Sequence, residues 1–167
     1  MPSWLFWLMS MELTVVSWGD VRTQKIPNFW SLFNLVVFIV LLFILPKIYV
    51  FRGDTFLYSV VFLLVGFLLF LMRIMGGGDS KFLCTFFLLI PAALQPIALV
   101  NLLVSTVLIG GFMFLTNMVK HHEKIVAALK VKNMQAVREC FGTKFSFAPV
   151  VLLAWLWLGW EQKLLTW

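Results

Sequence analysis

The sequence has little charge and almost no cysteine. Of its 167 residues, 12% are charged and 62% are hydrophobic, whereas soluble domains average about 25% charged and 45–50% apolar residues. A soluble core of this size cannot bury so many Phe, Leu, Val and Trp side chains. The apolar runs approach the roughly 20 residues that a membrane-spanning helix needs. The composition therefore predicts an all-α integral membrane protein, with the lipid bilayer as a partner.

Other absences exclude further classes of protein. The two cysteines, Cys84 and Cys140, form no CxxC pair, so neither a disulfide framework nor a zinc site is indicated. The N-terminal segment, MPSWLFWLMSMELTVVSW, lacks the positive n-region and the small-residue cleavage site of a signal peptide, and Glu12 interrupts it. We expect this segment to be a retained first span.

Breaks in hydrophobicity divide the chain into six expected spans within one domain. Proline and glycine clusters mark the breaks, and the short PAALQP stretch predicts a tight hairpin between the fourth and fifth spans. In residues 120–145, apolar side chains recur at helical spacing with lysines between them, which predicts an amphipathic helix on the inner membrane surface. The expected spans are residues 2–19, 29–46, 55–74, 81–95, 97–119 and 146–161.

Lysines and arginines are concentrated at one end of these spans. The opposite end has only Lys47, Arg52 and Lys163. Cationic loops stay on the cytoplasmic side of the inner membrane, so we expect the N-terminus to face outward. The net charge of +6 is thus a topology signal, and no aromatic-interleaved basic surface indicates nucleic-acid binding. His121 and His122 point in different directions on a helix without a third ligand nearby, so we expect a solvated face there and no metal.

Three acidic residues stand apart from the rest: Glu12, Asp20 and Asp79. The others lie in polar connections beside basic residues, where solvation accounts for them. Asp20 ends the first span and Asp79 begins the fourth. Because two spans separate them, both aspartates are expected at the same edge of the membrane, which is the cytoplasmic edge in the orientation above.

The residues alone leave two interpretations of these aspartates open. In the structural one, Asp79 and Asn28 cap the helices that follow a glycine turn and Pro27. In the functional one, Asp20 and Asp79 share a proton, activate a water and polarise a peptide carbonyl, while the glycines beside Asp79 let a substrate backbone approach. Glu12, about 12 Å from Asp20 along a helix, is an intramembrane polar group whose role stays open between structure and function.

The letters around both aspartates resemble the motifs of a known family. GGGD at 76–79 resembles the GxGD motif of membrane aspartyl proteases, and DVRTQKIPN at 20–28 resembles the first aspartate motif of the prepilin peptidases, or type IV leader peptidases. GGGDSK at 76–81 is similar to their second motif, and FAP at 147–149 to the start of their last span. The resemblance implies that Asp20 and Asp79 are the catalytic pair. The supporting residues that it implies are Arg22, Ile26, Pro27, Asn28, Gly76, Gly77, Gly78 and Lys81.

The resemblance also implies a reaction. Prepilin peptidases cleave the basic leader from prepilins and pseudopilins, usually after a glycine, on the cytoplasmic side of the inner membrane, and the hydrophobic helix of the substrate stays in the bilayer. The long members carry an insertion with two CxxC pairs, bind zinc, and methylate the mature pilin with S-adenosylmethionine. This chain lacks the insertion and is similar to the short members, which process Flp-type pilins or preflagellins. We therefore expect no cofactor, no metal and no methyltransferase activity.

Two other functions compete with this hypothesis. A small proton or cation conductor would use Glu12, Asp20 and Asp79 as a path, but it leaves the glycines and the RTQKIPN stretch without a role. A scaffold subunit of a secretion system would keep the fold and lose the aspartate pair. The sequence identifies neither the particular substrate nor the oligomeric state.

Overall fold

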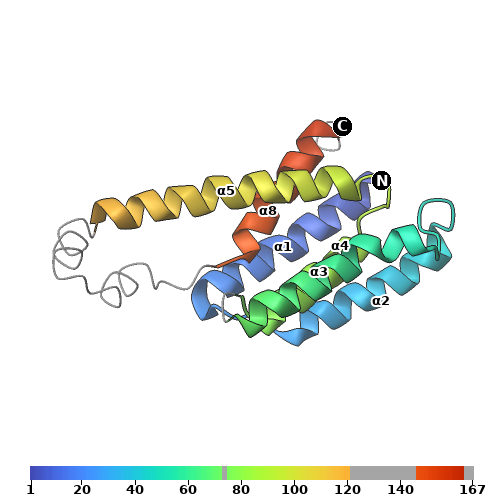
Figure 1. Ribbon diagram of the computed structural model, residues 1–167. Helices are drawn as coiled ribbons and strands as arrows, with labels where there is room; N and C mark the ends of the chain where they lie inside the picture. The colour runs from blue at the N-terminus through green and yellow to red at the C-terminus, as the bar shows by residue number, and fades with distance from the viewer. Residues whose placement is uncertain (73–74, 121–145, 164–167) are drawn as a thin grey trace.

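The computed structural model describes residues 1–72, 75–120 and 146–163, and within these ranges the chain forms helices and no strand. Each helix overlaps one of the six apolar segments predicted from the sequence, which confirms the all-helical class. The predicted amphipathic helix over 120–145 lies outside the described residues except at its first position. The helices are α1 (Ser3–Thr23), α2 (Asn28–Ile44), α3 (Gly53–Leu71), α4 (Gly77–Leu88), α5 (Gln95–Lys120) and α8 (Ala148–Glu161) (Figure 1).

The helix ends around the first connection follow local backbone chemistry. α1 ends at Thr23. The next residue, Gln24, donates its N–H to the main-chain carbonyl of Asp20 at 2.8 Å, and its left-handed backbone (φ 52°) turns the chain out of the helix. α2 starts directly after Pro27, because proline fixes φ and has no N–H to lose. The expectation that Asn28 caps α2 is wrong. Asn28 is the first helical residue, and no side chain caps this helix.

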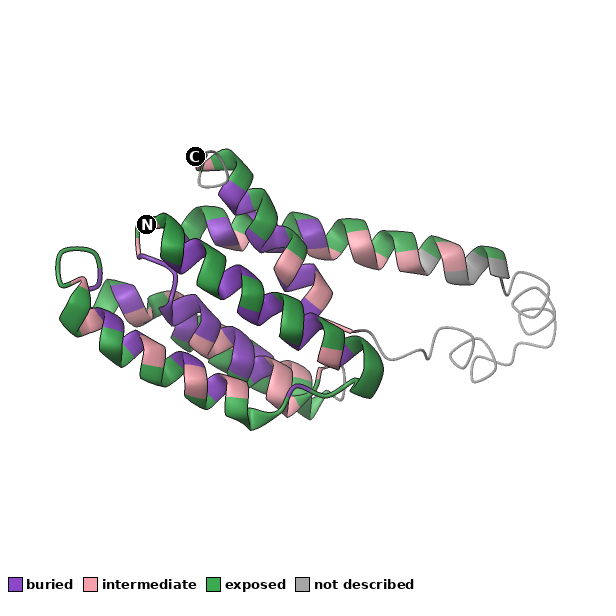
Figure 2. Ribbon diagram, turned by 180° about the vertical axis from the view of Figure 1, so that it is seen from behind, coloured by how far each residue is buried: buried purple, intermediate pink, exposed green. Residues whose placement is uncertain are grey.

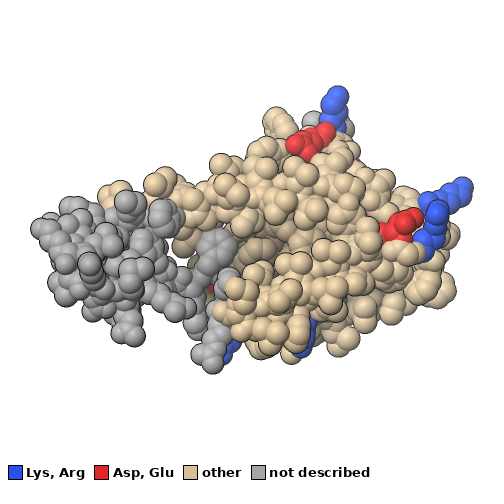
Figure 3. Space-filling view, in the orientation of Figure 1, with Lys and Arg blue, Asp and Glu red and all other residues tan. Residues whose placement is uncertain are grey.

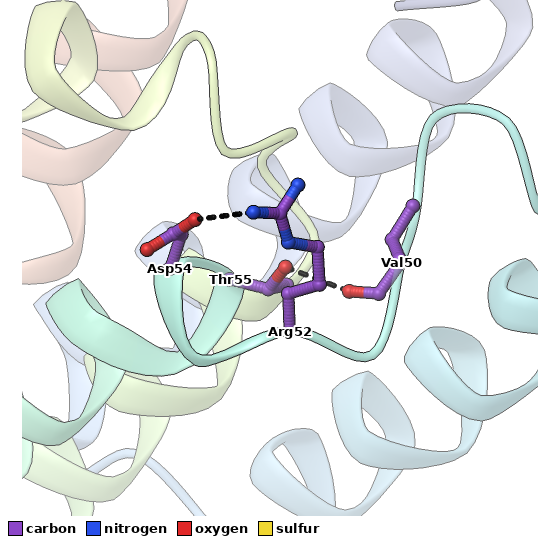
Figure 4. Close-up of polar contacts among 4 residues, drawn as sticks. All are labelled: Val50, Arg52, Asp54 and Thr55. Atoms are coloured by element: carbon purple, nitrogen blue, oxygen red, sulfur yellow. Dashed lines mark hydrogen bonds and ion pairs between the residues drawn. The ribbon is translucent and has the colours of Figure 1, made fainter.

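The turn before α3 is fixed by a side-chain hydrogen bond. The hydroxyl of the buried Thr55 donates to the main-chain carbonyl of Val50 at 2.8 Å (Figure 4). Arg52 and Asp54 form an ion pair at 3.7 Å on the same turn, with both side chains largely exposed. Exposed ion pairs contribute about 0–1 kcal/mol, so the Thr55 hydrogen bond is the stronger restraint on this turn.

α4 is the central helix of the bundle. It packs closely against α2 and α3, and half of its residues are buried (Figure 2). Gly66 of α3 allows this approach, because a Cβ there would lie 2.6 Å from the Cβ of Ser80. α4 starts at Gly77 rather than residue 81 and ends at Leu88 rather than residue 95. Its apolar sequence therefore reflects enclosure by other helices, since about 18 Å of helix is too short to cross a membrane alone.

The predicted tight hairpin of the fourth and fifth segments is wrong. α5 packs along α8, and α8 packs on α1, so α4 and α5 diverge after a short link. The side-chain amide of the fully buried Gln95 donates to three main-chain carbonyls, including that of Phe87 at 3.0 Å. The Tyr49 hydroxyl donates to the carbonyl of Leu89 at 2.6 Å. Gln95 and Tyr49 thus bind main-chain carbonyls at and just after the end of α4. These hydrogen bonds hold the segment between α4 and α5 in place although the two helices do not pack on each other.

The outer surfaces of several helices are apolar. Exposed hydrophobic side chains cover α2, α3 and the second half of α5, among them Phe43 (81% exposed), Phe67 (56%) and Val107 (73%). On the face in Figure 3, the charged side chains lie near the edges. By length and hydropathy, α3 and the Gln95–Met113 part of α5 are each sufficient to cross a membrane, and α2 and α8 are apolar but shorter.

Candidate active site

Both aspartates lie at the end of the bundle where α1 ends and α4 begins (Figure 1). Asp20 is in the last turn of α1 and is only 3% exposed. Asp79 is the third residue of α4 and is partly buried. The intervening helices α2 and α3 return the chain to this end, so residues far apart in sequence share one region of the molecule.

Asp79 has both a structural and an electrostatic relation to its surroundings. The expectation that Asp79 is the N-cap of α4 is wrong, because Gly76 is the N-cap and Asp79 the third helical residue. The Asp79 carboxylate instead accepts a hydrogen bond from the N–H of Gly76 at 3.3 Å, as in a capping box, which supports the start of α4. Burial, and after it the negative charge of Asp20, raises the pKa of the Asp79 carboxyl to about 6, while the Gly76 hydrogen bond opposes the shift. The Asp20 carboxylate is therefore close enough for its charge to influence the titration of Asp79.

The Asp20 carboxylate is held by the backbone at the start of α8. Its Oδ2 atom accepts a hydrogen bond from the N–H of Ala148 at 3.0 Å. The hydroxyl of Ser146 donates to the main-chain carbonyl of Asp20 at 3.3 Å. The N-terminus of a helix favours negative charge, because its free N–H groups and its dipole point toward an anion. The negative carboxylate at the end of α1 is thus stabilised by the N-terminus of α8.

A cavity of about 1040 Å³ lies beside Asp79. Residues 23–28, which connect α1 to α2, and residues 75–79, at the start of α4, form most of its wall, and Thr106 of α5 and Phe147 border it. The volume is that of a ligand-binding pocket. Asp20 is 3% exposed and is not among the residues that line the cavity. Of the predicted supporting residues, the wall contains Ile26, Pro27, Asn28, Gly76, Gly77 and Gly78.

The two predicted supporting cations lie outside the cavity wall. Arg22 is exposed, and its guanidinium carbon lies 4.4 Å from the centre of the Trp18 ring. Lys81 is exposed on α4. Neither cation lines the cavity beside Asp79. Because water and salt screen exposed charges, we expect their effect on the two carboxyl groups to be weak.

Gly78 brings the two aspartate motifs into contact. A Cβ at this position would collide with the main-chain carbonyl oxygen of Ile26, and Ile26 is itself buried. Sequence reasoning assigned the glycines beside Asp79 to the approach of a substrate backbone. At Gly78 the neighbouring backbone belongs to the chain's own first motif, so this glycine lets residues 20–28 pack against the start of α4.

Glu12 lies inside the bundle, two helical turns before Asp20. It is 5% exposed, and its carboxyl group faces the side-chain amide of the fully buried Asn34 on α2. Neither side chain makes a hydrogen bond of good geometry. Glu12 does not line the cavity beside Asp79, so it forms a polar contact of its own between α1 and α2.

Comparison with protein-family models gives one assignment. Residues 7–115 match the model of the type IV leader peptidase family. The chain belongs to the type IV leader peptidase family. The matched part includes both aspartates of this leader peptidase and ends before α8. Comparisons with curated proteins and with solved structures give no match.

Membership in the leader peptidase family fits the protease hypothesis better than the conductor or the scaffold. It makes the chain a member of a family of membrane-associated peptidases with prepilin-like substrates. Among the described residues, no group of three or more His, Cys, Asp or Glu side chains is arranged to bind a metal ion.

Sequence reasoning missed the contacts of this leader peptidase around Asp20. The FAP stretch at 147–149 marked only the start of the last helix, yet the N–H of Ala148 and the hydroxyl of Ser146 both bind Asp20. The donor of Ala148 is a main-chain N–H, which nearly every residue has, so no residue type in the sequence indicates it. The family match also stops before this segment. The available signal was the position of Pro149, which predicts a helix start and therefore free N–H groups.

Proposed function

We propose that this chain is an aspartic endopeptidase that removes the basic leader from prepilin-like substrates, including pseudopilins and preflagellins. Asp20 and Asp79 activate a water molecule, which cleaves the peptide bond after the leader. The reaction needs no metal and no organic cofactor. No methylation follows, because the chain lacks the two CxxC pairs of the long family members.

One observation carries this proposal: in a member of a peptidase family, Asp79 lines a large cavity and lies close enough to the buried Asp20 for the Asp20 charge to raise its pKa. Carboxyl groups that interact in this way share a proton, so one is an acid and the other a base. Such a pair can take a proton from water and give one to a peptide carbonyl. The capping interpretation explains the hydrogen bond between Asp79 and the Gly76 N–H, but it gives no role to the nearby charge of Asp20.

The cavity has room for the peptide around the scissile bond. It is bordered by Phe147 and by Thr106 of α5. The later part of α5 extends beyond the other helices (Figure 1). Beyond Thr106 the described side chains of α5 are exposed or half-buried and mostly apolar. A substrate with a basic leader and a hydrophobic helix can therefore bring its junction to Asp79 while the helix stays in lipid.

The proposal includes the location of the protein. The exposed apolar surfaces of α2, α3 and α5 favour contact with lipid, since soluble monomers rarely expose patches of more than a few hundred Å². The described helices then form one domain in the inner membrane, with the N-terminus outside and the aspartates at the cytoplasmic edge, as the distribution of cationic residues favours. The short α4 fits this arrangement because other helices enclose it.

Substitution of each aspartate by asparagine tests the proposal. Asn retains an oxygen that can accept the Gly76 N–H, so Asp79→Asn preserves the start of α4 and removes only the titratable group. We expect Asp20→Asn and Asp79→Asn each to abolish leader cleavage while the protein still accumulates in the membrane. The double variant should be no worse than either single one, because members of a catalytic unit are strongly non-additive.

The measurement is cleavage of a co-expressed prepilin-like substrate at matched levels of each variant. Asp54→Asn is the matched control, because Asp54 is exposed in an ion pair beside the first turn of α3, away from the cavity. It should cleave like the wild type. Cleavage by Asp79→Asn at a rate near that of the wild type would contradict the proposed function and favour the capping interpretation.

A further inference from the structure

The first turn of α8 offers an N–H group that its own helix does not use. Ala148 is the first helical residue and Pro149 the second, and proline has no N–H. The N–H of Val150 already donates to the carbonyl of Phe147 at 3.0 Å. The free donor at this helix end is therefore that of Ala148, and the Asp20 carboxylate accepts it in a buried environment.

Side-chain contacts fix the register of α8 against α1. The indole N–H of Trp155 donates to the Ser10 hydroxyl at 3.0 Å, and the Trp155 ring stacks on Phe6 with ring centres 5.1 Å apart. Gly159 lies so close to the Phe6 ring that a Cβ there would collide with it. These contacts leave little freedom for α8 to slide, so Ala148 is held opposite Asp20 by packing along the length of both helices.

We propose that the start of α8 is a positioning element of the active site, which holds Asp20 as the ionised base and leaves Asp79 as the acid. This inference rests on the proposed function and deepens it by giving each aspartate a role. The Ala148 N–H and the helix dipole stabilise a carboxylate, and a neutral acid gains much less from them. Asp79 faces the opposite situation, since burial and the Asp20 charge favour its protonated form, with a pKa of about 6.

With these roles, the hydrolysis takes place in two stages. Asp20 takes a proton from the water, the water oxygen attacks the peptide carbonyl carbon, and the Asp79 proton passes to the carbonyl oxygen. In the second stage the C–N bond breaks, the amine nitrogen receives the proton from Asp20, and Asp79 takes back its proton from the tetrahedral intermediate. One water and one peptide bond give one carboxyl and one amine, and both aspartates return to their starting states.

Few other charges face Asp20 from the described residues. α1 itself carries two other charged residues. Glu12 lies two turns away and faces Asn34, and Arg22 is exposed beside Trp18. Across the site are Asp79 and the exposed Lys81, and Lys25 lines the cavity. α8 itself has no titratable side chain before Glu161 at its far end. A change in the pH dependence caused by removing the Ala148 N–H therefore reports on the Asp20–Asp79 pair.

Replacing the amide N–H of Ala148 by an ester oxygen tests this inference. Incorporation of lactic acid at position 148 of the full chain removes the donor and keeps the side chain. It also weakens the Phe147 carbonyl as an acceptor of the Val150 and Val151 N–H groups, which is why the control ester at Val151 affects the same carbonyl. We expect kcat for a leader-containing substrate to fall about 10- to 100-fold, as for loss of a hydrogen bond to a charged group, with little change in KM. The acid limb of the pH–rate profile should move to higher pH, because the ionised base has lost a donor.

The control is the corresponding ester at Val151, whose N–H donates to the Phe147 carbonyl within the same helix. It weakens α8 by one ordinary hydrogen bond and should leave the pH profile in place. A profile for the position 148 ester that coincides with that of the Val151 ester would overturn the inference. If the two Asp→Asn variants still cleave, the proposed function fails; if they are inactive while the two esters behave alike, only this inference fails.

Infrared spectroscopy of the wild type and the Asp→Asn variants gives an answer that does not depend on the folding of the ester. At about pH 5 the absorption of protonated carboxyl groups should be smaller in Asp79→Asn than in the wild type. It should fall less in Asp20→Asn, where Asp79 stays protonated in part because burial still raises its pKa. The reverse result would make Asp20 the acid and overturn the assignment.

Discussion

Asp79 illustrates how one residue can satisfy two interpretations. Its carboxylate accepts the Gly76 N–H, as a capping residue would, and its titration responds to the charge of Asp20, as half of a catalytic pair would. Sequence reasoning could identify Asp79 from the GGGD letters, but not the balance of these contacts. That balance depends on burial and on the distance between charges, which the fold sets.

The raised pKa of Asp79 predicts the pH dependence of cleavage. Burial and the Asp20 charge disfavour the ionised form, so Asp79 keeps its proton up to about pH 6 and loses it as the pH rises further. Because the protonated form is the one that polarises the carbonyl, kcat/KM should decline as the pH passes about 6. The measurement is kcat/KM of the purified enzyme across the acid and neutral range, with the melting temperature followed in parallel. A rate that stays level through this range would contradict the role of Asp79 as the acid.

At the scale of helices and loops, the sequence predicted where helices occur better than how they pair. Apolar runs predicted all six described helices, because burial and lipid contact both require apolar side chains. The same runs could not distinguish the enclosed α4 from a lipid-facing span, and they suggested a hairpin of α4 and α5 where α5 packs on α8 instead. Pairing depends on long-range contacts, such as those of Trp155 with Ser10 and Phe6, that local patterns do not contain.

The contact of Gly78 with Ile26 predicts that the two motif loops act together. In Gly78→Ala the new Cβ collides with the Ile26 carbonyl, so residues 20–28 must move relative to α4. We expect cleavage to fall about 100-fold, as displacement of reacting groups by about 1 Å can do, and Gly78→Val to be at least as severe. The measurement is the initial rate of leader cleavage at matched expression.

Gly110→Ala on α5 is the control for this change. A Cβ at Gly110 would meet no atom within 4 Å, and alanine favours a helix more than glycine does. This variant should therefore keep wild-type activity and stability. Wild-type activity of Gly78→Ala would show that the two loops can separate without harm to the site.

At the scale of the whole molecule, large apolar side chains lie on the outside as well as in the core, and several polar side chains are enclosed. Asn34, Gln95 and Ser105 are completely buried, while Phe43 and Val107 are largely exposed. In the proposed membrane location, lipid covers the exposed apolar groups, and the enclosed polar groups lie where a bilayer cannot reach them. Composition predicted an apolar membrane protein, but it could not predict which polar side chains the bundle encloses.

Thiol labelling checks the orientation of the whole molecule. In a background without native cysteines, Arg22→Cys and Lys81→Cys should react with an impermeant thiol reagent only after the inner face is exposed, because both positions are exposed near the aspartates. Lys47→Cys, between α2 and α3 at the other end, should react in intact cells. Ser80 is less suitable for this purpose because it is buried against α3. Labelling of Arg22→Cys in intact cells would reverse the proposed topology.

The hydrogen bond between Ala148 and Asp20 joins residues that are 128 positions apart. A ribosome that has completed α4 has already made both aspartates, but not the donor that holds the first of them. On our assignment of roles, the growing chain therefore carries its reactive groups for a long time without a working base. On this assignment the site is complete only once the last helix has been made, because Ala148 follows both aspartates in the chain.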